Sequence, residues 1–302
     1  MKRISLWPCF LVAAVAPALA QVTVEVTQEQ NQFLPGETMI TAVHITNHSG
    51  QTLPLGGEDD WLTFSVESHD REIVPKTADV PVTGAFLLPS SKVATKRVDL
   101  APCFSATVPG AYSVTATVRI KGWNQEFTSA PKKFDIVEGA RLWEQEVGLP
   151  QPAGTTNTSP ETRRYVLQQA HYLKAQLRLY LRLMDGAGGR TIRVFPIGPM
   201  VSFGRPEPQV DRLSNLHLLY QDKPRSYDYT VFDPDGRVVV HETFDYVTSR
   251  PRLGPEGDGR ITVVGGTRRV TANDVPAPKP EDLSGDKPLS PVPPVEVQPR
   301  KP

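Results

Sequence analysis

Between residues 22 and 137, apolar and polar residues alternate in short runs that are separated by turn-forming residues. Val22, Val24 and Val26, for example, each stand between polar neighbours. A two-residue period is that of a β-strand with one buried face. The predicted strands cover 22–27, 39–46, 61–67, 93–100, 111–120 and 127–137. Several short strands with turns between them are typical of an antiparallel β-sandwich.

The second half of the chain continues with the same period. Leucine occupies every second position across 176–183, which predicts a strand there. This strand would place Arg178, Tyr180 and Arg182 on the face opposite the leucines. On a helix the leucines would be distributed around the helix axis, and the arginines would not share one solvent-exposed face. Helix remains the alternative, because Leu, Gln, Ala and Arg all have high helix propensity.

A weak internal repeat follows. Arg205 and Arg250, 45 residues apart, each begin an Arg-Pro pair, then a turn that contains Asp, then an alternating strand. This layout resembles the β-propeller repeats of secreted bacterial proteins, whose blades have four strands. A closed propeller needs at least about four blades, and this half has room for about two or three. The resemblance therefore implies a small antiparallel β module of blade-like repeats over 161–272.

Three motifs in the first half resemble bacterial immunoglobulin-like domains. They are the turn Leu34–Glu37, the strand end Ile45–Asn47 and the segment Val108–Val114, which contains Pro-Gly-Ala-Tyr. The resemblance covers 21–139 and implies an immunoglobulin-like β-sandwich. It implies little about function, because this fold carries adhesion, spacing, inhibition and enzyme-appended roles. The paired cysteines of antibody-type domains are absent, which indicates a variant without the disulfide bridge.

The N-terminus has the pattern of a secretory signal peptide. Lys2 and Arg3 precede a mostly apolar stretch that ends in small residues. This pattern predicts a signal peptide over 1–20 with cleavage between Ala20 and Gln21. We therefore expect an exported protein, periplasmic or extracellular. No later stretch of the sequence is long and apolar enough to predict a transmembrane segment.

Composition marks two further segments and a change of charge. The segment 149–160 is rich in Pro, Gly, Thr and Ser and is predicted as a linker. The tail 273–302 holds nine prolines and is predicted as disordered. Basic residues number 10 against 16 acidic ones in 21–149, and 17 against 12 in 150–272. Such opposite charges are typical of solvated faces or of docking between two modules, and the surplus is too small to indicate nucleic acid.

Few residues carry a recognisable chemistry. Without the signal peptide Cys103 stands alone, so we expect no internal disulfide and interpret this thiol as a buried apolar group. No metal-ligand, nucleophile or nucleotide-binding motif occurs, so the sequence predicts neither a cofactor nor a metal site. We interpret the densest carboxylate cluster, Glu58–Asp60, as a solvated turn.

One candidate binding set combines arginine and tyrosine, which binding surfaces favour. It consists of Tyr180, Arg182, Tyr220, Arg225, Tyr227 and Tyr229. These residues predict a face for carbohydrate or peptide; the alternative is that the tyrosines only fill strand faces.

The function that these patterns favour is that of an exported, non-catalytic binding or envelope-organising protein with a protein or polysaccharide partner. A secreted proteinase inhibitor is the first alternative, and an accessible reactive loop at Leu88–Val93 would favour it. A hydrolase is the second alternative, which a deep pocket with convergent acids would favour.

Overall fold

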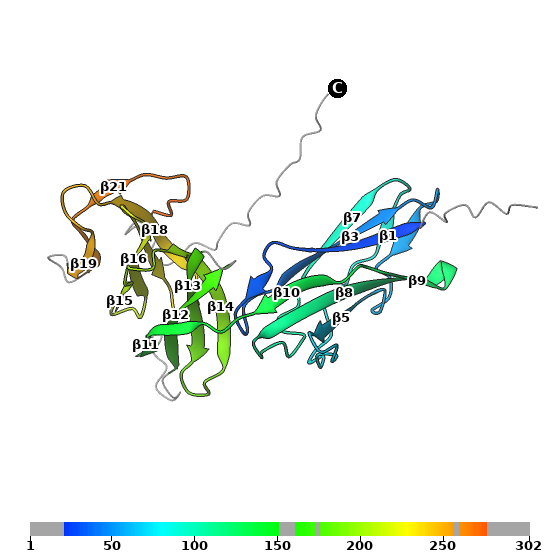
Figure 1. Cartoon of the computed structure of the whole chain (residues 1–302), viewed down its shortest axis with the longest axis horizontal. Helices are drawn as coiled ribbons and strands as arrows, with labels where there is room; N and C mark the ends of the chain where they lie inside the picture. Colours follow the sequence, from blue (N-terminus) through cyan, green and yellow to red (C-terminus); the bar gives the residue numbers. More distant parts are fainter. Residues whose placement is uncertain (1–20, 151–160, 173–175, 256–259, 277–302) are drawn as a thin grey trace, which may run out of the picture. The chain divides into compact units, whose positions relative to one another are not determined.

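Figure 1 shows a computed structural model of the chain, which describes residues 21–150, 161–172, 176–255 and 260–276. The described residues form β-strands and one short 3-10 helix, so the predicted all-β class is confirmed. No helix among them is long and apolar enough to cross a membrane. The chain divides into two compact units, Met1–Gly139 and Ala140–Pro302. The predicted signal peptide, most of the predicted linker and most of the tail lie outside the described residues.

The first unit consists of two main sheets and a small two-stranded one around one apolar core. One sheet has the order β1-β3-β7, from β1 (Val22–Gln28), β3 (Ile40–Asn47) and β7 (Val93–Asp99). The other has the order β2-β10-β8-β5, from β2 (Gln32–Phe33), β10 (Lys132–Ile136), β8 (Gly110–Ile120) and β5 (Leu62–Ser68). β9 (Gln125–Thr128) also pairs with β8, and β4 (Leu53–Leu55) pairs with β6 (Phe86–Leu88). Only β2 and β10 run parallel among these pairs of described strands.

The alternation of apolar and polar residues explains most of this unit. Of every two neighbouring residues in a strand, the apolar one points into the core between the sheets. Every strand predicted between 22 and 120 is confirmed within a residue or two. The run 127–137 is not one strand: its two parts are β9 and β10, with a break at Pro131 that separates them. Proline donates no backbone hydrogen bond and therefore interrupts a ladder. The short strands β2, β4 and β6 were not predicted, since two or three residues show no period.

The turn Leu34–Glu37 ends β2 and returns the chain toward β3. The N–H of Glu37 donates to the carbonyl of Leu34 at 3.0 Å. Gly36 has φ +77°, in the left-handed region that the third residue of a type II turn requires. Pro35 supplies the fixed φ that suits the second position. The local sequence therefore determines this turn.

The second unit also has two main sheets, but their strands follow the order of the chain. One is β11 (Ala140–Gly148), β12 (Thr162–Tyr172), β13 (Gln176–Asp185) and β14 (Thr191–Met200). The other is β15 (Glu207–Val210), β16 (Leu216–Lys223), β17 (Ser226–Phe232), β18 (Val238–Asp245) and β21 (Thr267–Arg269). An apolar core joins the two sheets. A smaller core lies on the other face of the second sheet, where the hairpin of β19 (Arg252–Pro255) and β20 (Ile261–Val264) packs.

The strand predicted over 176–183 is confirmed as part of β13. Leu179, Leu181 and Leu183 are completely buried in the core between the sheets. The prediction that the face opposite the leucines is solvent-exposed is wrong at Tyr180, which is completely buried too. β13 is an inner strand, and its neighbours β12 and β14 place the buried Val166 and Val194 on the same face as Tyr180.

The predicted linker does not separate the two units. β11 precedes 149–160 and pairs with β12 beyond it, so this segment connects two strands of one sheet. The boundary between the units lies at Gly139 instead. Trp143 and Val147 of β11 pack against the core of the second unit, which is why the strand belongs there. A composition rich in Pro, Gly, Thr and Ser fits a hairpin loop as well as a linker.

The two copies of the Arg-Pro repeat begin two hairpins, β15–β16 and β19–β20. They belong to different sheets, one of five strands and one of two. The sheets are built from β11–β14 and from β15–β18. The 45-residue spacing therefore does not coincide with the boundaries between sheets. Part of the second copy, 256–259, lies outside the described residues. The resemblance to propeller repeats stays a prediction.

Candidate functional site

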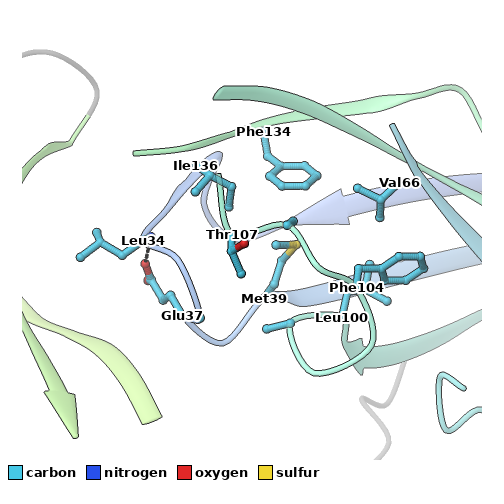
Figure 2. Close-up of a pocket in the computed structure, with 12 residues that line it drawn as sticks. Leu34, Glu37, Met39, Val66, Leu100, Phe104, Thr107, Phe134 and Ile136 are labelled. Carbon is cyan, nitrogen blue, oxygen red and sulfur yellow. Dashed lines mark hydrogen bonds between the residues drawn. The ribbon is translucent and has the colours of Figure 1, made fainter. Parts of the chain in front are cut away.

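An apolar cavity lies at one end of the first sandwich (Figure 2). Met39, Phe104 and Phe134 line it together with aliphatic side chains such as Val66 of β5 and Ile136 of β10. Its volume is about 40 Å³, which holds no more than a few water molecules. The cavity is therefore a packing feature and is too small for an organic ligand.

Glu37 is the one carboxylate that lines this cavity, and only 2% of it is exposed. Its Oε2 accepts a hydrogen bond from the N–H of Leu34 at 2.7 Å, drawn as a dashed line in Figure 2. Its Oε1 accepts from the side-chain amide of Gln30 at 2.6 Å. Buried carboxylates are retained where donors satisfy them. Glu37 thus locks the turn Leu34–Glu37, and these bonds give it a structural role.

A shallow groove of about 360 Å³ lies on the same unit, between the loop after β5 and the start of β8. Two large aliphatic residues line it and face solvent: Ile73 is 73% exposed and Val108 is 66% exposed. Pro75 and Pro109 add further apolar surface. Exposed apolar side chains that line one groove are a feature of interaction sites. Sequence reasoning missed it, although Ile73 and Val108 were readable as apolar residues inside turn-rich segments.

The predicted Arg/Tyr set does not form one exposed face. Tyr180, Tyr220, Tyr227 and Tyr229 are 0%, 2%, 4% and 6% exposed. Tyr220 belongs to the core between the two sheets, whereas Tyr227 and Tyr229 belong to the smaller core on the other side. Neighbouring tyrosines along β17 alternate with polar residues, and both faces of this sheet are covered, so the rings fill cores. Their burial favours the alternative interpretation, in which the tyrosines only fill strand faces.

The two arginines of the set also lie apart. Arg182 on β13 is partly buried and donates to Gln168 Oε1 at 3.0 Å and to Thr191 Oγ1 at 3.2 Å. Burial lowers the pKa of this guanidinium. Arg225 is exposed in the turn between β16 and β17. The arginines and tyrosines of the predicted set therefore do not form a common exposed surface.

His217 joins two other side chains in a buried chain of hydrogen bonds. Its Nδ1 lies 2.7 Å from the hydroxyl of Tyr229, and its Nε2 lies 3.3 Å from Asp211 Oδ2. Burial lowers the pKa of His217, and Asp211 opposes this in part. A neutral imidazole fits these contacts: Tyr229 donates to Nδ1, and Nε2–H donates to the carboxylate. With 8% of its surface exposed, His217 is a packed histidine.

Asp228 is a partly buried acid of the same unit. It accepts hydrogen bonds from the hydroxyls of Tyr220 and Thr243, each at 3.3 Å. Burial first, and the nearby carboxylate of Asp222 second, raise the pKa of Asp228. Gly198 leaves the room for Tyr220, because a Cβ there would lie 2.5 Å from the tyrosine hydroxyl oxygen. The group is therefore a polar part of a packed core.

The acidic motifs of the sequence are turns in the structure. Glu58 pairs with Lys121, and Asp60 pairs with Arg119, all exposed. Asp233 Oδ1 accepts from the backbone N–H groups of Asp235 and Arg237 and closes the β17–β18 hairpin. No group of three or more metal-ligating side chains occurs among the described residues.

Two further sequence interpretations concern Cys103 and the loop Leu88–Val93. Cys103 is 2% exposed, and burial, followed by the charge of Asp99, raises the pKa of its thiol, as expected for a packed cysteine. The loop Leu88–Val93 is a tight turn, because the N–H of Lys92 donates to the carbonyl of Pro89 and Ser91 has φ +61°. Most of this loop is exposed, Val93 to 57%, so it is accessible as the inhibitor alternative requires, although its backbone forms a turn.

Comparisons with known proteins give little guidance. No protein-family model matches the chain, and no curated protein matches it either. Among solved structures it is similar to the sporulation control protein Spo0M from Bacillus subtilis, with 12% identity and a TM-score of 0.29. That alignment covers 59% of this chain and 90% of Spo0M. A similarity at this level supports no conclusion about fold or function.

Proposed function

We propose that the protein is an exported, non-catalytic binding protein that recognises a partner protein through its first unit. Export is inferred from Lys2, Arg3 and the small residues Ala18 and Ala20 around an apolar stretch, all outside the described residues. A chain isolated from the native host should therefore begin at Gln21.

An immunoglobulin-like sandwich is the proposed fold of the first unit. In chain order, β1, β3 and β7 take the places of strands A, B and E, and β5, β8 and β10 those of C, F and G. The hydroxyl of Tyr112 near the start of β8 donates to the carbonyl of Val108 at 2.7 Å. A tyrosine near the start of strand F that bonds to the backbone a few residues upstream is a hallmark of such sandwiches.

The observation that carries the binding function is the groove with the exposed Ile73 and Val108. Two aliphatic side chains in water cost free energy that a partner recovers by covering them. Carbohydrate sites usually present exposed aromatic rings, but the tyrosine ring in this groove, Tyr112, is buried against Phe134. The aliphatic lining therefore favours a protein partner over a polysaccharide.

The test is capture of the partner from an envelope extract of the native host by the mature chain, residues 21–302. A variant with Ile73→Asp and Val108→Asp should retain at least about tenfold less partner, since buried apolar anchors dominate binding energy. Leu87→Asp is the matched control, because Leu87 is 69% exposed on the same unit but outside the groove. Equal capture by all three chains, or no capture by the wild type, would contradict the proposal.

A further inference from the structure

The groove at Ile73 and Val108 carries negative charge as well as apolar surface. Asp70 and Glu72 line it, both are exposed, and no lysine or arginine lines it. The ion pairs among the described residues of this unit lie elsewhere, at Lys76–Asp79, Arg119–Asp60 and Lys121–Glu58. The two carboxylates in the groove are therefore not neutralised by a described side chain of this unit.

Both carboxylates belong to the turn that follows β5. The N–H of Arg71 donates to the carbonyl of Ser68 at 3.0 Å, and the N–H of Ser68 donates to the carbonyl of Glu72 at 2.9 Å. Arg71 has φ +62° and, unlike its two acidic neighbours, does not line the groove. Backbone hydrogen bonds thus hold Asp70 and Glu72 at the groove without the guanidinium between them.

One backbone position in the groove also lacks hydrogen-bond partners. Ala111 of β8 lies opposite Asp135 of β10, whose N–H donates at 2.8 Å to the carbonyl of Asn31 on the far side. In an antiparallel pair of this kind, both residues direct their backbone groups away from each other. On the other side of Ala111, β5 ends at Ser68, opposite Tyr112. The N–H and carbonyl of the exposed Ala111 therefore face the groove with no partner among the described residues.

Each of these features corresponds to a property of the segment that fits the groove. Ile73 and Val108 favour an apolar side chain, because covering them removes apolar surface from water. Asp70 and Glu72 favour a lysine or arginine beside that side chain, since opposite charges complement each other across an interface. The backbone groups of Ala111 favour an extended segment, whose own N–H and carbonyl groups are free to pair.

We propose that the partner enters this groove with an extended segment in which an apolar residue stands next to a lysine or arginine. The apolar side chain lies against Ile73 and Val108, the basic one reaches Asp70 and Glu72, and the backbone pairs with Ala111. The inference rests on the proposed function and deepens it, because it names the chemistry of the segment that the groove recognises.

The first test repeats the capture from envelope extract with a variant of the mature chain that carries Asp70→Asn and Glu72→Gln. This variant should retain at least about fivefold less partner at low salt, because the basic side chain loses both opposite charges. Glu25→Gln with Glu126→Gln is the matched control, since it removes the same charge from exposed positions outside the groove. Added salt should reduce capture by the wild type more than capture by the Asp70 and Glu72 variant.

The second test uses the mature chain and two acetylated, amidated hexapeptides, one alternating arginine with leucine and one alternating glutamate with leucine. NMR titration should show the arginine peptide binding at least about fivefold more tightly, since the glutamates oppose the carboxylates of the groove. The amide of Ala111 should gain protection from hydrogen exchange when the arginine peptide binds. The amide of Tyr112 is the internal control, because it already pairs with β10 opposite Phe134.

The outcomes separate this inference from the proposed function. If Ile73→Asp with Val108→Asp loses the partner while the Asp70 and Glu72 variant captures as much as its matched control, the charge assignment is wrong and the binding function stands. Equal affinity for the two peptides, or no protection of Ala111, would overturn the inference as well. Self-association of the mature chain that Ile73→Asp abolishes would assign the groove to a second copy and contradict the inference.

Discussion

The two units both stack β-sheets, but their chains connect the strands differently. In the first unit, sheet neighbours lie far apart in sequence, as in the pairs β3–β7 and β2–β10. In the second, each strand from β11 to β14 and from β15 to β18 pairs with the next one. Pairing between distant segments has a larger loop-closure cost, so we expect the second unit to form its sheets faster.

The units also differ in what they bury. The described core of the first is a single apolar cluster, and its one buried carboxylate, Glu37, is held by a local turn. The second unit covers both faces of the β15–β18 sheet and thereby encloses His217, Asp228 and several tyrosines. When both faces of a sheet are packed, neither set of alternating side chains faces solvent. Polar side chains must then form hydrogen bonds within the protein. Burial of polar groups is thus a consequence of layering.

The largest expected effect is that of Leu179→Ala in the second unit. Leu179 is completely buried, and a buried leucine truncated to alanine costs about 2–5 kcal/mol of unfolding free energy. Leu213→Ala is the control, because Leu213 is 63% exposed in a turn of the same unit. Urea unfolding followed by hydrogen exchange of each unit should place the loss in the second unit. An equal loss in the first unit would show that the two cores are not independent.

Glu37→Ala tests the buried carboxylate of the first unit. It leaves the N–H of Leu34 and the amide of Gln30 without this acceptor, which should cost about 1–3 kcal/mol. Glu126→Ala, at an exposed position of β9, should cost little and serves as the control. The measurement is the urea midpoint of the first unit. No difference between the two variants would mean that Glu37 does not stabilise the turn.

The smallest effect concerns Asp228→Asn and its dependence on pH. Since burial raises the folded-state pKa of Asp228, its contribution to stability is full below the unfolded value, about 3.9, and is lost as the pH rises. Asp228→Asn should therefore stabilise the second unit near pH 7 and have no effect below about pH 3.9.

Asp211→Asn is the matched comparison, because it should have the opposite sign. Burial acts to raise the pKa of Asp211, but hydrogen bonds from Asn215 and His217 outweigh burial and lower it. The contribution of Asp211 to stability is present above its unfolded-state pKa and is lost as the pH falls through its folded-state pKa. Thermal unfolding at several pH values measures both variants. The same sign for both would contradict the assigned environments.

Part of the fold was predictable because its causes are local. The strands around Val24 and Leu181 follow from a two-residue period, and the turns at Gly36 and Gly236 follow from residues that tolerate positive φ. The candidate site was less predictable. The tyrosines of the predicted set fit a binding surface and a packed core equally well, and the sequence gives no measure of which faces a second layer covers.

By itself the sequence determined the all-β class and the position of most strands, including β13 with its leucine face, since alternation is a property of neighbouring residues. Only the tertiary structure decided the boundary at Gly139 and the burial of Tyr180. Each of these depends on which distant segment packs beside a strand or over its face. A period along the chain carries no information about that partner, and so the surface proposed for binding appeared only in the folded protein.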